Sequence, residues 1–171
     1  MRYLAVITLL VLTLAMVRPV AAQSFKPDNN AGVAAYKRGD YARAVQHFRP
    51  LANHGHAGAQ YNLGVAFDEG LGVTKDPKQA VRWYRKAANQ GYAHAQANLG
   101  ATYFTGNGVL KDLVMAYVWY NVAAANGKSK LAPKSRNFIG QRLSQSDLKK
   151  AQKLSKLCLK KPAKCPEYSD D

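Results

Sequence analysis

The chain contains an internal repeat with a period of 36 residues, which constrains its fold more than any other feature of the sequence. The glycine-rich segment GLGVTKD that starts at Gly70 returns at Gly106 as GNGVLKD. The residues that follow it also return: Ala80, Trp83, Tyr84, Ala87, Ala88 and Gly91 correspond to Ala116, Trp119, Tyr120, Ala123, Ala124 and Gly127. A fixed period of roughly 20–50 residues is typical of stacked supersecondary units. The functional question therefore concerns a repetitive surface more than a single catalytic pocket.

Each repeat is predicted to form two helices joined by the glycine loop. In the first half, Ala59, Leu63 and Phe67 recur at i, i+4 and i+8, which is one stripe of a helix. Gly64 lies within this helix, where glycine costs about 1 kcal/mol relative to alanine. Because a glycine recurs there in the next repeat, we expect a bulky side chain to pack on it, with Trp83 as the predicted partner.

The second helix of each repeat has a clear predicted start. Asp76 can accept hydrogen bonds from the free backbone N–H groups, and Pro77 suits the first helical position because it lacks an N–H. Asp112 repeats this cap in the next unit. The alanines and aromatic residues that follow are spaced at i, i+3, i+4, i+7 and i+8, which predicts an apolar helix face with close packing.

Weaker matches and new helix signals flank the two clear repeats. Asp40, Ala44 and Phe48 lie 36 residues before Asp76, Ala80 and Tyr84, as expected for a degenerate first unit. The predicted segments are a signal peptide (1–22), a disordered linker (23–30), a degenerate repeat (31–56), two full repeats (57–92 and 93–128), basic C-terminal capping helices (129–161) and a tail (162–171).

Two helices are expected in the basic C-terminal segment, as a cap on the stack. Phe138 and Ile139 are predicted to face inward on the first. Ser144 and Asp147 form a predicted capping box at the start of the second. The apolar side of this last helix is predicted to comprise Leu148, Ala151, Leu154 and Leu157.

The N-terminus has the pattern of a cleaved export signal. Arg2 precedes an apolar run, and the small residues Val20, Ala21 and Ala22 predict cleavage before Gln23. A membrane anchor is the alternative, although the run is short for about 30 Å of hydrocarbon. We therefore expect a periplasmic or secreted bacterial protein with no transmembrane segment after cleavage.

The chain is strongly basic, with a formal net charge of +15 and a pI near 9.9. Between Lys128 and Lys164 there are 12 Lys and Arg residues and one acid, Asp147. Such a field attracts anionic envelope polymers or lipid surfaces, although a solvated helix face that aids solubility is the alternative. We expect no nucleic-acid partner, because export removes most access to nucleic acid.

Both cysteines, Cys158 and Cys165, lie near the C-terminus. Export would place them where disulfides persist, which favours a Cys158–Cys165 bridge over two free thiols. The bridge would hold the end of the last helix.

The repeated motif, Gly-x-Gly-Val-x-x-Asp followed by Ala-x-x-Trp-Tyr-x-x-Ala-Ala-x-x-Gly, resembles the Sel-1-like repeat, a relative of the tetratricopeptide repeat. The resemblance implies an all-α fold, a right-handed α-solenoid of antiparallel helix pairs with capping helices at both ends. It also implies a protein-interaction adaptor without a fixed partner. Some cysteine-rich bacterial members are linked to penicillin binding, but neither full repeat here contains a cysteine, which counts against that activity.

No catalytic, metal-binding or cofactor-binding pattern emerges from the sequence. The histidines, His47, His54, His56 and His94, lack further ligands at recognisable spacing and are interpreted as ordinary residues of helix turns. We therefore expect no enzyme activity and no cofactor, with a hydrolase or penicillin-binding activity as the weakest alternative.

The resemblance to tetratricopeptide proteins places a protein or peptide partner in a concave groove formed by the first helices. Residues that differ between the repeats are the predicted contacts: Tyr61, Val65, Asp68, Glu69, His94, Ala101, Phe104 and Thr105. The alternative for each is ordinary exposed helix surface or packing between repeats. Binding of an anionic polymer or membrane by the basic C-terminal helices is the second hypothesis.

Overall fold

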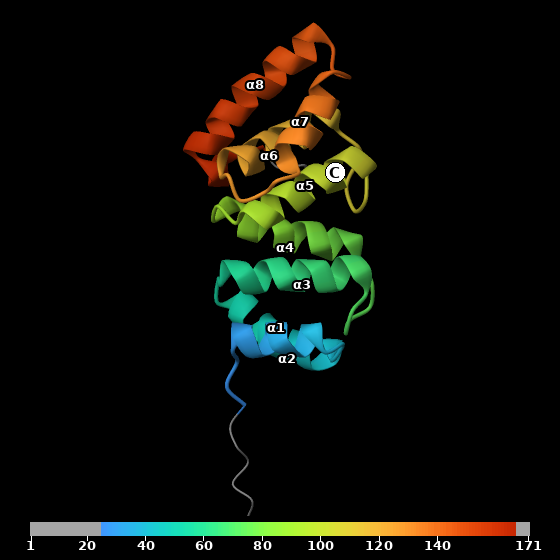
Figure 1. Ribbon diagram of the computed structural model, residues 1–171, viewed down its shortest axis with the longest axis vertical. Helices are drawn as coiled ribbons and strands as arrows, with labels where there is room; N and C mark the ends of the chain where they lie inside the picture. The colour runs from blue at the N-terminus through green and yellow to red at the C-terminus, as the bar shows by residue number, and fades with distance from the viewer. Residues whose placement is uncertain (1–24, 167–171) are drawn as a thin grey trace, which may run out of the picture.

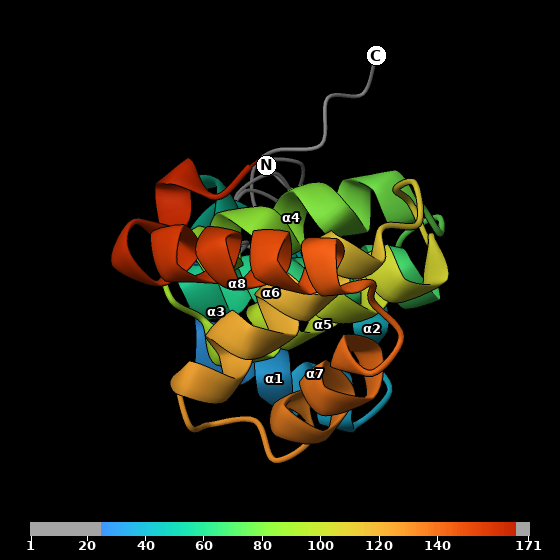
Figure 2. The same cartoon turned by 90° about the horizontal axis from the view of Figure 1, so that it is seen from above.

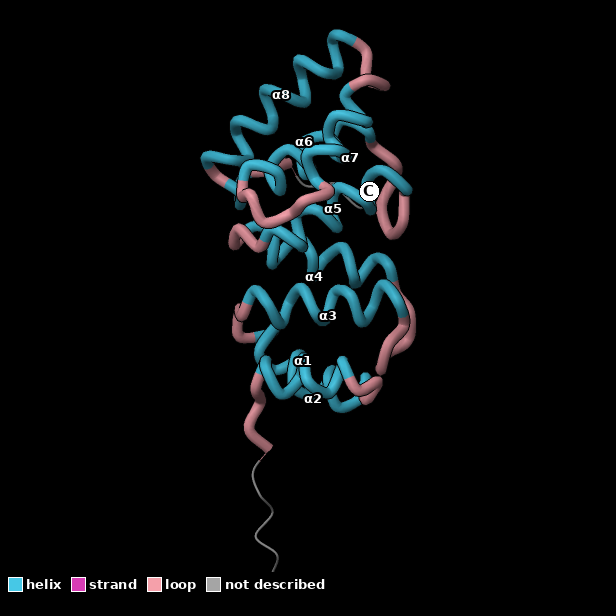
Figure 3. The backbone as a smooth tube through the Cα atoms, viewed as in Figure 1, coloured by secondary structure: helices cyan, strands magenta, loops and turns pink. Residues whose placement is uncertain are grey.

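The computed structural model describes residues 25–166, and this part of the chain is entirely helical apart from loops (Figure 3). The predicted signal peptide and the last five residues lie outside the described residues. The helices are α1 (Asn29–Lys37), α2 (Tyr41–Asn53), α3 (Ala57–Glu69), α4 (Pro77–Asn89), α5 (Ala93–Thr105), α6 (Leu113–Ala125), α7 (Ala132–Gly140), α8 (Gln145–Lys160) and the short 3-10 helix η1 (Pro162–Lys164). The predicted all-α architecture is confirmed.

The helices stack along the long axis of the molecule as consecutive packed pairs (Figure 1). Within the pairs, α1 packs on α2, α3 on α4 and α5 on α6. Neighbouring pairs meet through α2 with α3, α4 with α5 and α6 with α7. This is the arrangement of an α-solenoid, in which each unit buries its apolar faces against its neighbours.

The first helix begins inside the segment that was predicted to be a disordered linker. Asp28 is the N-cap of α1, and its Oδ1 accepts hydrogen bonds from the backbone N–H groups of Asn30 and Ala31. The predicted linker (23–30) is therefore wrong for residues 29 and 30, which are helical. The degenerate repeat was predicted to begin at residue 31, whereas Asp28 starts the helix before that point.

The other predicted helix starts are confirmed. The Asp76 carboxylate accepts from the backbone N–H of Gln79, and that of Asp112 accepts from Val114 and Met115. Ser144 accepts from the N–H of Asp147 at the start of α8.

The predicted partner of the mid-helix glycines is wrong by one residue. A Cβ atom on Gly64 would lie 2.6 Å from Cδ1 of Tyr84, and one on Gly100 would lie 2.8 Å from Cγ of Tyr120. The tyrosines, not the tryptophans, therefore pack on the glycines. Adjacent residues on a helix point about 100° apart, so Trp83 is turned away from this contact and is only partly buried.

The C-terminal helices α7 and α8 cover α6, and the residues that they bury differ in part from the predicted ones. Both α7 and α8 pack against α6, which accounts for the apolar character of that helix on nearly every side. On α7, Ala132 and Ile139 are buried, whereas Phe138 is 46% exposed. The prediction for Phe138 is wrong, because adjacent residues on a helix point about 100° apart and the turn of α7 that places Ile139 in the core leaves Phe138 at its edge.

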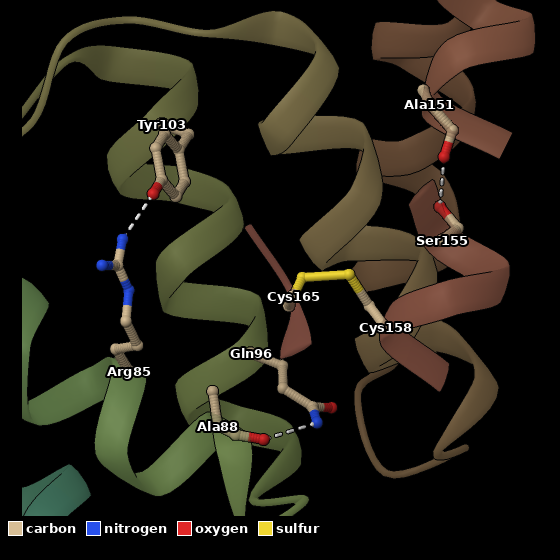
Figure 4. The surroundings of a disulfide bond; sticks show 8 residues. All are labelled: Arg85, Ala88, Gln96, Tyr103, Ala151, Ser155, Cys158 and Cys165. Atoms are coloured by element: carbon tan, nitrogen blue, oxygen red, sulfur yellow. Dashed lines mark hydrogen bonds between the residues drawn. A yellow bond between two sulfur atoms is a disulfide. The ribbon is translucent and has the colours of Figure 1, made fainter. Parts of the chain in front are cut away.

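The buried side of α8 also differs from the prediction. Ala151 is buried as predicted, and Leu154 packs partly buried against the core. Ser155 and Cys158 are also buried, whereas Leu157 is 41% exposed. Cys158 and Cys165 are joined by a disulfide with their Cα atoms 4.7 Å apart (Figure 4). This bridge turns the chain back after α8, and η1 contacts α4. The helix is thus held by the disulfide and by small buried residues as well as by Leu154, and only part of its leucine periodicity faces the core.

Candidate partner-binding surface

Two hollows lie along the surface that the first helices contribute. The smaller, of about 140 Å³, lies between α1 and α3, and the larger, of about 410 Å³, lies among α5, α6 and α7. The smaller is lined by Val33, Tyr36, Phe48, Tyr61, Asn62 and Val65. The larger is lined by Phe104, Tyr120, Lys134, Ser135, Phe138 and Ile139. Both linings are rich in apolar and aromatic side chains with a few polar groups, as in typical ligand sites.

Three of the predicted contact residues lie in these hollows. Tyr61 and Val65 line the smaller hollow, and Phe104 lines the larger one. The predicted set is thus divided between two separate hollows. Ala101 is half-buried on α5 and lines neither of them.

Asp68 holds the repeats together and does not line either hollow. Its Oδ2 accepts a hydrogen bond from the Tyr84 hydroxyl at 3.2 Å, and its Oδ1 accepts one from Asn107 Nδ2 at 2.7 Å. Burial, followed by the charge of Asp68, raises the pKa of Tyr84 well above its usual range, so the phenol stays protonated and donates. Asp68 therefore connects one repeat to the next, which is the alternative given above to a partner contact.

The other predicted contacts lie on exposed helix surface. Glu69 accepts a hydrogen bond from the Tyr36 hydroxyl at 3.4 Å, which joins α1 to α3. His94 is exposed, with its ring centroid 5.9 Å from those of Tyr61 and Tyr92. The Thr105 hydroxyl donates to the carbonyl of Ala101 within the same helix.

Sequence reasoning missed the aromatic pair that dominates the larger hollow. The Phe104 and Phe138 rings lie 6.1 Å apart, centroid to centroid, and meet edge to face. The Arg142 guanidinium carbon is 3.4 Å from the Phe138 ring centroid, and Lys111 Nζ is 5.8 Å from that of Phe104. The adjacency of Phe138 and Ile139 gives no signal for this, since adjacent helical residues can both be buried, as Val118 and Trp119 are on α6.

The polar groups of the hollows are suited to binding and form no acid–base pair. Burial raises the pKa of Tyr61 and also that of Tyr120, so both phenols stay neutral at physiological pH. Elsewhere, His56 caps α3 by accepting from the N–H of Ala59, and His47 accepts from the N–H of Asp28. Within residues 25–166, no three His, Cys, Asp or Glu side chains cluster as a metal site would require.

Comparison with known proteins agrees with the geometry. A family model described as "Sel1 repeat" matches residues 31–56, 57–92 and 93–128. A crystal structure of a protective antigen from uropathogenic Escherichia coli strains, which displays an SLR fold, is similar at 37% identity over 78% of this chain, with a TM-score of 0.75. A Sel1 repeat protein from Oxalobacter formigenes is similar at 36% identity over 66% of this chain, with a TM-score of 0.62. The chain spans 29% and 46% of the lengths of these two proteins. No curated protein matches the chain significantly.

Proposed function

The chain belongs to the Sel1 repeat family, and on that premise we propose that it is an exported adaptor that binds a peptide or protein on the surface of its first helices. Solenoids of this family are generally protein-interaction scaffolds. The proposal is supported by two hollows, one beside Tyr61 of α3 and one between Phe104 of α5 and the residues of α7.

The observation that carries the proposal is the exposed aromatic pair of the larger hollow. Phe138 remains 46% exposed next to Phe104 and to a hollow of about 410 Å³. Exposed aromatic side chains beside a hollow are typical anchors of protein interfaces. Lys134 in the lining and Arg142 on the ring add positive charge. The partner segment is therefore expected to insert an apolar side chain flanked by acidic residues.

Site-specific photo-crosslinking in the native envelope tests this assignment. A photoreactive residue at Val65 or Phe138 should capture one discrete partner. The same residue at Gln46 or Gln152, which are exposed on α2 and α8, is the matched control and should capture none. Equal capture from all four positions would reject the proposed surface.

Export is supported by the N-terminal sequence pattern and by the disulfide between Cys158 and Cys165, since such bonds persist in oxidising compartments. Within the described residues, no helix has the length and apolarity needed to cross a membrane. Cell fractionation with N-terminal sequencing should recover a product that starts at Gln23. A cytoplasmic product with an intact N-terminus would reject export.

A second proposal is that α8 binds an anionic envelope polymer or membrane surface. Its outer side has a hollow of about 510 Å³ lined by Lys150, Lys153, Leu154, Lys156, Leu157 and Lys160. Lysines around exposed leucines are typical of helices that lie on anionic surfaces. Cosedimentation with phosphatidylglycerol vesicles should be strong at low salt and weak at physiological salt. Equal binding to phosphatidylcholine vesicles would argue against this second function.

A further inference from the structure

A basic cavity of about 470 Å³ lies on α4, at the loop that follows α5. Figure 2 shows α4 on the opposite side of the molecule from α1 and α7, which carry parts of the two hollows. Four of the described lining residues are cations and none is a carboxylate; the cations are Lys78, Arg82, Arg85 and Lys86. Trp83 and Gly108 complete part of the wall.

The repeat fold does not require these four charges. At the equivalent positions 36 residues later, the chain has Val114, Val118, Asn121 and Val122 on α6. That helix is covered by α8, and Val118 and Val122 are fully buried. At the equivalent positions 36 residues earlier, it has Ala42, Gln46, Arg49 and Pro50. Four cations on this stripe are thus a particular property of α4.

Arg85 is held in place within the cavity wall. Its Nη2 donates a hydrogen bond of 2.6 Å to the hydroxyl of Tyr103, a residue that is only 1% exposed (Figure 4). A side chain fixed in this way loses little conformational freedom when a ligand binds. The phenol is a neutral acceptor, so this bond does not neutralise the half-buried guanidinium. A partly desolvated cation is stabilised by an anion at close range.

From this arrangement we propose that the α4 cavity binds a phosphate group. A phosphate monoester carries about −1.5 to −2 charges and three acceptor oxygens at neutral pH. Arginine and lysine side chains recognise such oxygens with charge-assisted hydrogen bonds. A single carboxylate would leave most of the charge of Lys78, Arg85 and Lys86 uncompensated. The volume is within the roughly 300–1,000 Å³ of small-molecule sites, so the cavity also has room for the group that carries the phosphate.

Calorimetric titration of the full mature chain at physiological ionic strength tests the proposal and identifies the source of the phosphate. The three probes are inorganic phosphate, glucose 6-phosphate and phosphatidic acid vesicles, for a free ion, a sugar phosphate and a lipid phosphate monoester. At least one should bind saturably, with one phosphate group per chain. The double variant Lys78→Gln/Lys86→Gln, at two exposed positions, should weaken this binding at least tenfold.

Two further variants separate a defined site from diffuse attraction. Lys149→Gln/Lys153→Gln removes the same charge from exposed positions of α8 and should change the affinity for the two soluble phosphates less than twofold. Arg85→Lys keeps the charge but loses the planar guanidinium, and it should weaken binding about three- to tenfold with unfolding temperature unchanged. The proposal is overturned if no probe saturates, or if the α8 variant weakens binding of the soluble phosphates as much as the α4 variant does. Vesicle binding that only the α8 variant abolishes would support the α8 proposal and reject a lipid source for the α4 cavity.

Discussion

Replacing the two repeated tryptophans with alanine should have unequal effects, although they occupy the same position of the 36-residue motif. Trp119 is 1% exposed in the core around α6, whereas Trp83 is only partly buried, with Lys86 Nζ 4.2 Å from its ring centroid. We expect Trp119→Ala to lower the free energy of unfolding by about 3–5 kcal/mol, as for other buried tryptophans. Trp83→Ala removes less buried apolar area and should cost about 1–2 kcal/mol.

Urea denaturation followed by circular dichroism measures both values on one scale. Trp119→Phe is the matched control, because it keeps a large ring and removes an indole N–H that is buried without a hydrogen-bond partner. Loss of that unsatisfied donor partly offsets the lost volume, so this variant should cost less than about 2 kcal/mol. Equal losses of unfolding free energy for the two alanine variants would refute the inference that α7 and α8 bury Trp119 more deeply than Trp83.

Three other predictions concern single contacts. Gly100→Ala would press a methyl group against Tyr120 and should destabilise by about 1–3 kcal/mol in thermal melts. Gly58→Ala, whose methyl group would lie 3.2 Å from the exposed His56 ring and 3.9 Å from Asn29, should cost less. Tyr84→Phe should cost about 1–2 kcal/mol at pH 7, because it removes the donor to Asp68 Oδ2 and leaves that carboxylate with only the hydrogen bond from Asn107. The folded state raises the pKa of Tyr84, so the contribution of the neutral phenol to the free energy of unfolding is complete below pH 10 and is lost as the pH rises above it. The variant should therefore show a flatter decline of the free energy of unfolding in alkaline solution. Cys165→Ser should lower the unfolding free energy by about 2 kcal/mol and abolish any effect of reductant; a variant that remained sensitive to reductant would contradict this account.

The helix pairs and their starts could be predicted because they depend on local chemistry. Asp76 and Asp112 cap their helices through atoms two or three residues away, so the sequence alone contains the necessary information. The glycine loops and the period likewise predict that consecutive units stack. The sequence also indicated that Gly64 and Gly100 need a bulky neighbour, although it could not determine which of two adjacent aromatic residues fills that role.

The candidate surface could be predicted only in part, because exposure depends on which elements cover each other. Comparison of the repeats selected Tyr61, Val65 and Phe104 as partner contacts, and these three residues line the two hollows. It also selected Asp68, whose partners Tyr84 and Asn107 lie 16 and 39 residues away in the chain. It missed Phe138, since the contact of α7 with α5 lies outside the repeated region.

The sequence by itself determined a solenoid of helix pairs, because periodicity, caps and turns act over a few residues. The tertiary structure decided how equivalent positions differ. α8 packs over one side of α6, and three of the four equivalent positions there are valines. On α4 the same four positions are cations that line a surface cavity. Identical motif positions therefore acquire different environments, since burial is a property of the neighbouring helices and not of the residue itself.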